Sequence, residues 1–250
     1  MEQRPLFNRR VSTHLPGQPN GQHIGFRCIT DDGGFYYCKP DAGALPIRAV
    51  EWLCTSLAEH LGIAVAAHAI IEDENGETYF GSRSPASLAD DTEVARMLST
   101  PATGELGQPV SWLGQHLARL RAFDLFIDNP DRSVRNFIID RDGGFSRLCA
   151  IDFASSRLLK LPTERFPIAA EPTIFVGNMM QRTHGSCAES ALEMIDRIRA
   201  VPTSTIESFF KGLPEEWLAH DQRGMLYEYW SSDKKQNRLE LLRARISDGR

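Results

Sequence analysis

Apolar and polar positions alternate through much of the first third of the chain, which is the pattern of half-buried β-strands. The segments Ile24–Thr30 and Phe35–Lys39 are predicted strands, and the sequence DDGG between them is a typical hairpin turn. A second predicted hairpin has its strands at Ile63–Ile71 and Thr78–Gly81, joined by the turn sequence DENG. The first third is therefore expected to be rich in strands.

Further along the chain, apolar residues recur at helical spacing. The first such segment begins at Ile47 and ends at Gly62, a residue type that commonly terminates helices. A longer one begins at Ser111 and continues to Ile127. Helices are also predicted for residues 188–201, 205–211, 215–229 and 234–246. The polar, turn-rich residues 82–109 and the residues that follow Leu159 are predicted to form loops.

A strand-rich first part followed by a helical second part predicts an α+β protein with two lobes. We assign residues 1–82 to an N-terminal lobe and residues 83–250 to a helical C-terminal lobe. Ligands commonly bind in the cleft between two such lobes. We therefore expect the functional residues to face this cleft.

The stretch from Phe123 to Ala154 carries the candidate chemistry. Asp131 lies in the loop sequence NPDR, Asn136 follows five residues later, and Asp152 ends the second of two predicted strands, 137–140 and 147–152. Enzymes of the protein-kinase type use this order of side chains: an Asp orients the attacking hydroxyl, and an Asn and a second Asp hold Mg²⁺. Each residue alone is also typical of a turn or a strand end, but the three together favour a catalytic centre.

A nucleotide-binding pair is predicted upstream. Lys39 ends a strand, where its ammonium can contact nucleotide phosphates, and Glu51 on the following helix can pair with it. The simpler alternative is a lysine at a strand end and a glutamate on a solvated helix face. The segment Ser12–His23 contains glycines and prolines and is a candidate for a phosphate-covering loop without the GxGxxG pattern. An ordinary N-terminal loop is the alternative.

Composition narrows the class of protein. Of the 250 residues, 42% are hydrophobic, and a formal net charge of -5 gives no general attraction to nucleic acid or to anionic membranes. The five cysteines form no CxxC pair, which predicts buried free thiols in a reducing compartment. Neither a secretory signal nor a membrane-spanning window of roughly 18 apolar residues is visible, so we expect a soluble cytoplasmic protein. Zinc-ligand spacing and a GxSxG nucleophile motif are also missing.

The sequence AFDLFIDNPDRSVRNFIID followed by AIDFA resembles the HipA-like kinases, an atypical group of Ser/Thr kinases that includes bacterial toxin kinases. The segments VEWLCTSLAEHLGI, LPEEWL and NRLELLRARI resemble the small kinase domain of this family, and the phosphatidylinositol kinases are more distantly similar. The resemblance implies a bilobal protein-kinase-like fold and an ATP- and Mg²⁺-dependent phosphotransferase that acts on a protein Ser or Thr. It gives Asp131 the catalytic role, Asn136 and Asp152 the metal-ligand roles, and Lys39 the ATP-phosphate role.

Two positions depart from ordinary protein kinases, because Asn129 stands where they have His and Ala154 stands where they have Gly after Asp-Phe. Three alternatives to a protein kinase stay open: a pseudokinase acting as a binding or regulatory module, a kinase-fold AMP transferase, and a metal-dependent hydrolase using Asp131 and Asp152. The sequence also leaves open the acceptor, toxin activity, a regulatory or antitoxin-like protein partner, and autophosphorylation at a loop serine such as Ser12.

Overall fold

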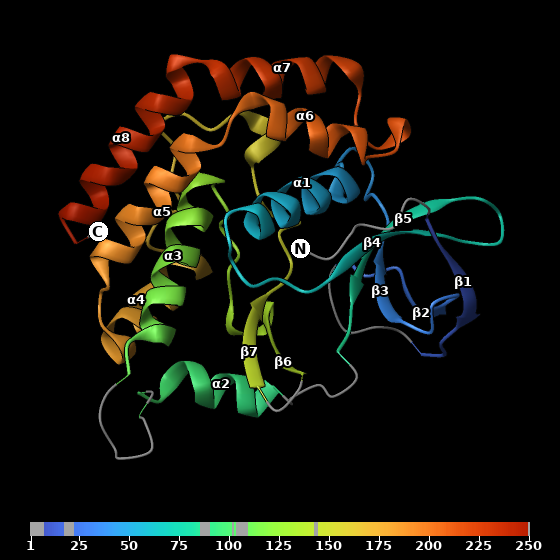
Figure 1. Ribbon diagram of the computed structural model, residues 1–250, viewed down its shortest axis with the longest axis horizontal. Helices are drawn as coiled ribbons and strands as arrows, with labels where there is room; N and C mark the ends of the chain where they lie inside the picture. Colours follow the sequence, from blue (N-terminus) through green and yellow to red (C-terminus); the bar gives the residue numbers. More distant parts are fainter. Residues whose placement is uncertain are drawn as a thin grey trace.

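The computed structural model describes residues 8–17, 23–85, 91–101, 103, 110–142 and 145–249. Five strands gather at one side of the molecule and most of the helices at the other, as Figure 1 shows. The α+β architecture predicted from the sequence is therefore confirmed. The division of the lobes between residues 82 and 83 stays a prediction.

A small closed barrel forms the strand-rich side, in the order β1-β2-β3-β5-β4. Its strands are β1 (Arg9–His14), β2 (Phe26–Thr30), β3 (Phe35–Lys39), β4 (His68–Glu72) and β5 (Thr78–Arg83). Neighbouring strands are antiparallel except β1 and β4, whose parallel pairing closes the barrel. Cys38 packs in the small core of the barrel, and because side chains alternate along a strand, Lys39 points to the opposite face.

Helix α1 (Ile47–His60) follows the third strand and packs against the helical side of the molecule (Figure 1). Its apolar residues belong to the same continuous core as those of the later helices, whereas the barrel has a separate core. Gly62 has a φ of +80°, a conformation that glycine adopts without steric cost, which explains why the helix ends there as predicted.

The helical side is built around α3, which packs against α4, α5 and α8. Its helices are α2 (Asp91–Ser99), α3 (Trp112–Phe126), α4 (Pro172–His184), α5 (Ala188–Ala200), α6 (Thr203–Lys211), α7 (His220–Ser231) and α8 (Asp233–Ser247). The described residues also form the short 3-10 helices η1 (Val134–Asn136), η2 (Leu158–Lys160) and η3 (Glu215–Trp217).

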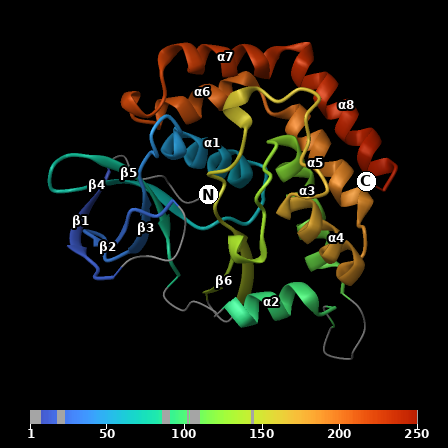
Figure 2. The same cartoon turned by 180° about the vertical axis from the view of Figure 1, so that it is seen from behind.

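A hairpin of β6 (Phe137–Asp142) and β7 (Phe145–Ala150) lies between the two sides of the molecule. The backbone N–H of Ala150 donates to the Ala64 carbonyl at 2.8 Å, and Val65 pairs with Ala150 in an isolated bridge. These contacts fix the end of β7 beside the chain that leaves α1. In Figure 2, the segment that follows β7 passes beside α1 before it reaches α4.

Several elements differ from the sequence-based prediction. Strand β1 and helices α2 and α4 lie in segments that were predicted as loops or not assigned. The predicted strand at 63–71 begins only at His68, because Ile63 and Val65 pack in the large core instead of continuing the barrel. The helix predicted for 215–229 is divided into η3 and α7, since Leu218 is buried with an extended backbone between them.

The cysteines agree with the prediction of free thiols. Four of them are buried, Cys187 is partly buried, and all five are unpaired by disulfides. Within the ranges that the structure describes, none of the helices has the length and apolar character needed to cross a lipid bilayer.

Candidate active site

Lys39 occupies the end of the barrel strand β3 and lies at the junction of the two sides of the molecule. Only 4% of this residue is exposed. Its Nζ donates to Glu51 Oε1 at 2.5 Å and to Asp152 Oδ1 at 2.8 Å. Burial opposes the charged form, but the two carboxylates outweigh burial and raise the pKa of Lys39. The lysine is therefore held in its cationic state between two acidic partners.

Glu51 connects this lysine to the loop that follows β7. The residue lies on α1 and is 1% exposed. Besides Lys39, its carboxylate accepts hydrogen bonds from the backbone N–H groups of Phe153 and Ala154, both at 3.1 Å. Burial raises the pKa of Glu51, while Lys39 and the N–H of Phe153 act in the opposite direction. The pairing of Lys39 with Glu51, one of the two interpretations that the sequence left open, is present in the structure.

Asp152 lies two residues beyond the end of β7 in an unusual backbone conformation. Its φ is +60°, which is uncommon for a non-glycine residue, and such a conformation persists only where surrounding contacts offset its strain. Burial would raise the pKa of Asp152, but the charge and hydrogen bond of Lys39 outweigh burial and lower it. The side chain is 39% exposed, so its carboxylate is still accessible to a ligand.

Asp131 is exposed in the loop between α3 and η1. Partial burial of the carboxylate and the negative charge of Asp152 raise the pKa of Asp131, whereas Arg132 and His23 lower it. The two carboxylates therefore lie close enough to influence each other. The structure thus brings Asp131 to the same region as the Lys39, Glu51 and Asp152 cluster.

Asn136 ends η1 and immediately precedes β6, at the strand start where the sequence placed it. It is buried, and its Oδ1 accepts a hydrogen bond from the Ser133 hydroxyl. Its carbonyl accepts from the backbone N–H of Ile151 at 3.0 Å. This contact places Asn136 beside the residue that precedes Asp152.

A buried ion pair supports these loops, and sequence analysis did not identify it. Arg132 Nε and Nη2 donate to the two carboxylate oxygens of Asp124 at 2.8 and 3.0 Å, and both side chains are almost completely buried. Arg132 Nη1 also donates to the carbonyls of Asn136, at 3.0 Å, and Ile151. The Arg132 guanidinium therefore connects the NPDR loop to Asn136 and to Ile151, the residue that precedes Asp152.

Two further polar residues hold the NPDR loop from the other side. The Asn129 amide donates to Asp124 Oδ1 at 2.8 Å. The Thr173 hydroxyl donates to the Asn129 carbonyl at 2.6 Å and accepts from the Arg132 backbone N–H at 2.8 Å. The sequence contains one signal of this network: Asp124 interrupts the apolar helix sequence AFDLFI, where a buried carboxylate requires a partner.

The candidate phosphate-covering loop at 12–23 is only partly described. Residues 12–14 belong to β1, Gly17 has a φ of +88°, and residues 18–22 lie outside the described residues. His23 follows them, and its influence on the pKa of Asp131 places it near the proposed catalytic loop. The assignment of this loop to phosphate binding stays a prediction.

The side chains available for a divalent metal are oxygen donors. Asp152 offers a partly exposed carboxylate, and Asn136 offers an amide oxygen on the neighbouring loop. Mg²⁺ prefers oxygen ligands and commonly binds through one or two protein side chains together with substrate phosphates and water. The chemistry of this pair therefore fits Mg²⁺.

A strand lysine paired with a helix glutamate, and an aspartate on each of two nearby loops, define a site of the protein-kinase class. A sequence model of the HipA-like kinase family matches residues 17–244, so the chain belongs to this family of kinases. No curated protein matches the sequence.

Similar solved structures agree with a kinase fold. The chain is 12% identical to the proinflammatory kinase CtkA of Helicobacter pylori, with a TM-score of 0.60, and the match covers 94% of this chain and 96% of CtkA. It is 14% identical to a chain of the HipA, HipB and operator DNA complex, a toxin–antitoxin system of Shewanella oneidensis MR-1, with a TM-score of 0.47 and coverage of 86% and 58%. The similarity to CtkA confirms the predicted kinase-like bilobal fold.

Proposed function

We propose that this protein is an ATP- and Mg²⁺-dependent kinase that transfers the γ-phosphoryl group to a Ser or Thr of another protein. The observation that carries the proposal is the contact of Lys39 with both Glu51 and Asp152, at 2.5 and 2.8 Å, beside the loop of Asp131. Phosphoryl transfer depends mainly on positioning and electrostatic stabilisation. In the proposal, this cluster supplies one cation for the nucleotide phosphates, an aspartate for the metal and an aspartate for the acceptor hydroxyl.

Each residue has a distinct role in the proposal. Lys39 binds the nucleotide phosphates, and Glu51 keeps its ammonium oriented. Asn136 and Asp152 would hold Mg²⁺, which neutralises charge on the phosphates when it is bound. Asp131 orients the acceptor hydroxyl and accepts its proton, a role that is helped by a raised pKa.

Binding of the nucleotide requires a rearrangement of one ion pair. In the structure Asp152 uses Oδ1 to accept from Lys39. A phosphate that reaches Lys39 competes with Asp152 for the same ammonium, and the partly exposed Asp152 carboxylate would hold Mg²⁺. Glu51 keeps its two backbone N–H donors throughout and holds the loop after Asp152 in place.

Intact-mass spectrometry after incubation with ATP, Mg²⁺ and a mixture of candidate acceptor proteins tests the proposal. We expect added phosphate on an acceptor or on the kinase itself. Asp131→Asn should lower the rate of phosphate incorporation by roughly 10²–10⁴-fold, because the amide cannot accept the proton. A full rate in this variant would contradict the role of Asp131. Addition of AMP in place of phosphate would replace the kinase proposal by an AMP transferase.

Lys39→Met is expected to weaken binding of Mg·ATP by roughly 10- to 100-fold, because a charge-assisted hydrogen bond contributes about 1.5–3 kcal/mol. Isothermal titration calorimetry measures the dissociation constant directly. Lys160→Met is the matched control, since Lys160 is exposed at the end of η2. Equal affinity in wild type and Lys39→Met would show that Lys39 does not contact the phosphates.

A further inference from the structure

The barrel and the helical side of the molecule also meet at the start of β5, away from the candidate active site. The Thr78 hydroxyl accepts a hydrogen bond from Trp217 Nε1 at 2.7 Å and donates to Glu216 Oε1 at 2.7 Å. Thr78 is the first residue of β5, whereas Glu216 and Trp217 belong to η3, between α6 and α7. Only 2% of Trp217 is exposed. A short segment from the C-terminal part of the chain is thus fixed to the barrel.

Arg48, in the first turn of α1, joins this contact to the helix that carries Glu51. Its Nη1 donates to the Thr78 carbonyl at 2.8 Å, and its guanidinium carbon lies 5.3 Å from the centre of the Trp217 ring. A cation over the face of an aromatic ring is attracted by the negative charge of that face. One side chain of α1 therefore bonds to the barrel and packs on η3.

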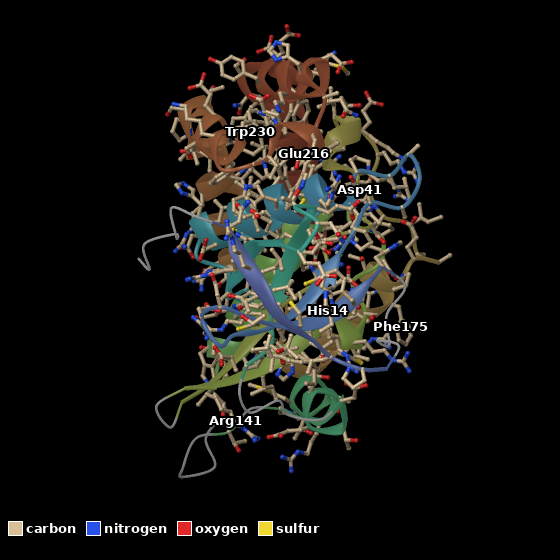
Figure 3. All side chains as sticks on the ribbon, turned by 90° about the vertical axis from the view of Figure 1, so that its right-hand side faces the viewer. His14, Asp41, Arg141, Phe175, Glu216 and Trp230 are labelled. Carbon is tan, nitrogen blue, oxygen red and sulfur yellow. The ribbon has the colours of Figure 1, made fainter. Side chains whose placement is uncertain are left out.

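Asp41 connects Arg48 to the strand that ends at Lys39. Its Oδ2 accepts from Arg48 Nε at 2.9 Å and from Nη2 at 2.8 Å, and its Oδ1 accepts from the Arg48 backbone N–H at 2.9 Å. Charge-assisted pairs of this kind are stronger and more directional than single neutral hydrogen bonds. In Figure 3, Asp41 and Glu216 lie toward the same end of the molecule, above the strand that carries His14. The chain that leaves β3 and the segment η3 thus hold the first turn of α1 together.

Trp52 makes a further contact between α1 and this part of the helical side. Its Nε1 donates to the Phe209 carbonyl of α6 at 3.1 Å, and its ring meets the Trp217 ring edge to face, with centroids 6.5 Å apart. Arg48 and Trp52 are about one helical turn apart, and Glu51 lies between them in the sequence. A displacement of this turn would therefore move the Glu51 carboxylate away from its own partners.

We propose that Trp217 is a positioning residue for the active site. Through its contacts with Thr78 and Arg48, it holds the start of α1 against the barrel. Glu51 is thereby kept within hydrogen-bond distance of Lys39 and of the two backbone N–H groups that donate to it. The inference rests on the proposed kinase function, in which Glu51 orients the ammonium of Lys39.

Hydrogen exchange followed by NMR tests this role at the backbone N–H groups of Phe153 and Ala154, which donate to Glu51. Amide exchange reports how often such a bond opens locally. Trp217→Phe keeps an aromatic ring but removes the N–H that bonds to Thr78. We expect exchange at the two amides to become about 3- to 10-fold faster, which is the effect of losing one hydrogen bond. Thr78→Val removes the acceptor, keeps the β-branched shape and should have the same effect.

Trp230→Phe is the matched control. Trp230 Nε1 donates to the Val201 carbonyl at 2.9 Å, and the residue is 2% exposed on α7. The substitution removes the same kind of buried bond but should leave exchange at the two amides at the wild-type rate. Faster exchange in Trp217→Phe and Thr78→Val, but not in Trp230→Phe, supports the inference whether or not the protein transfers phosphate. Wild-type exchange in Trp217→Phe and Thr78→Val, or an equal acceleration in Trp230→Phe, overturns it.

Discussion

Asp152→Asn is expected to abolish phosphoryl transfer while the protein remains folded. The change removes the negative charge that would bind Mg²⁺, and metal stabilisation of phosphoryl charge is worth several kcal/mol. Since each 1.36 kcal/mol changes a rate tenfold, we expect kcat to fall by at least about 10⁴-fold. Transfer of labelled phosphate from ATP measures the loss, and thermal unfolding followed by circular dichroism reports on the fold.

The choice of substitution matters because Asp152 has a φ of +60°. Asn adopts this backbone region more readily than other non-glycine residues, so Asp152→Asn changes the charge without the conformational penalty. Asp152→Ala should lose activity equally but should also unfold at a lower temperature. Asp140→Asn, on a partly exposed residue of β6, is the control and should keep both activity and stability. Substantial turnover in Asp152→Asn would remove this residue from the proposed mechanism.

The sequence was most informative where the candidate site residues follow short, strongly patterned elements. Asp131, Asn136 and Asp152 are separated by a loop and two short strands, and their order, which is that of protein-kinase-type enzymes, predicted a shared site. Lys39 could be placed because the alternation of FYYCK and the DDGG turn define the strand that it ends. The helical period starting at Ile47 likewise placed Glu51 on α1.

The supporting network could not be predicted in the same way, because it depends on contacts between distant segments. Thr173 is 41 residues from Arg132, and helix α4, which carries it, was predicted as loop. The donors to Glu51 at Phe153 and Ala154 are likewise more than 100 residues away from it. No local pattern specifies such pairings, since any Thr or backbone N–H has the required chemistry. They are determined only when α4 packs against α3 and the loop after β7 meets α1.

Removal of one partner of the buried ion pair between Asp124 and Arg132 is expected to destabilise the fold strongly. Both side chains are at most 3% exposed. Asp124→Ala would leave the Arg132 guanidinium buried without its carboxylate, which costs about 3–5 kcal/mol in comparable buried pairs. Urea unfolding monitored by tryptophan fluorescence measures the change in the free energy of unfolding. Asp196→Ala, which removes the exposed salt bridges of this α5 residue with Arg199 and with Arg243 on α8, should change it by less than about 1 kcal/mol.

A double variant separates the contribution of the ion pair to stability from its effect on the catalytic loops. Replacing both partners by apolar residues of similar volume, Asp124→Leu with Arg132→Met, leaves no buried charge and should recover much of the lost stability. Activity should not return, because Met cannot donate to the carbonyls of Asn136 and Ile151 that Arg132 holds. Recovery of stability without activity would show that Arg132 positions the loops of Asp131 and Asp152. Recovery of both would show that the ion pair acts only on the fold.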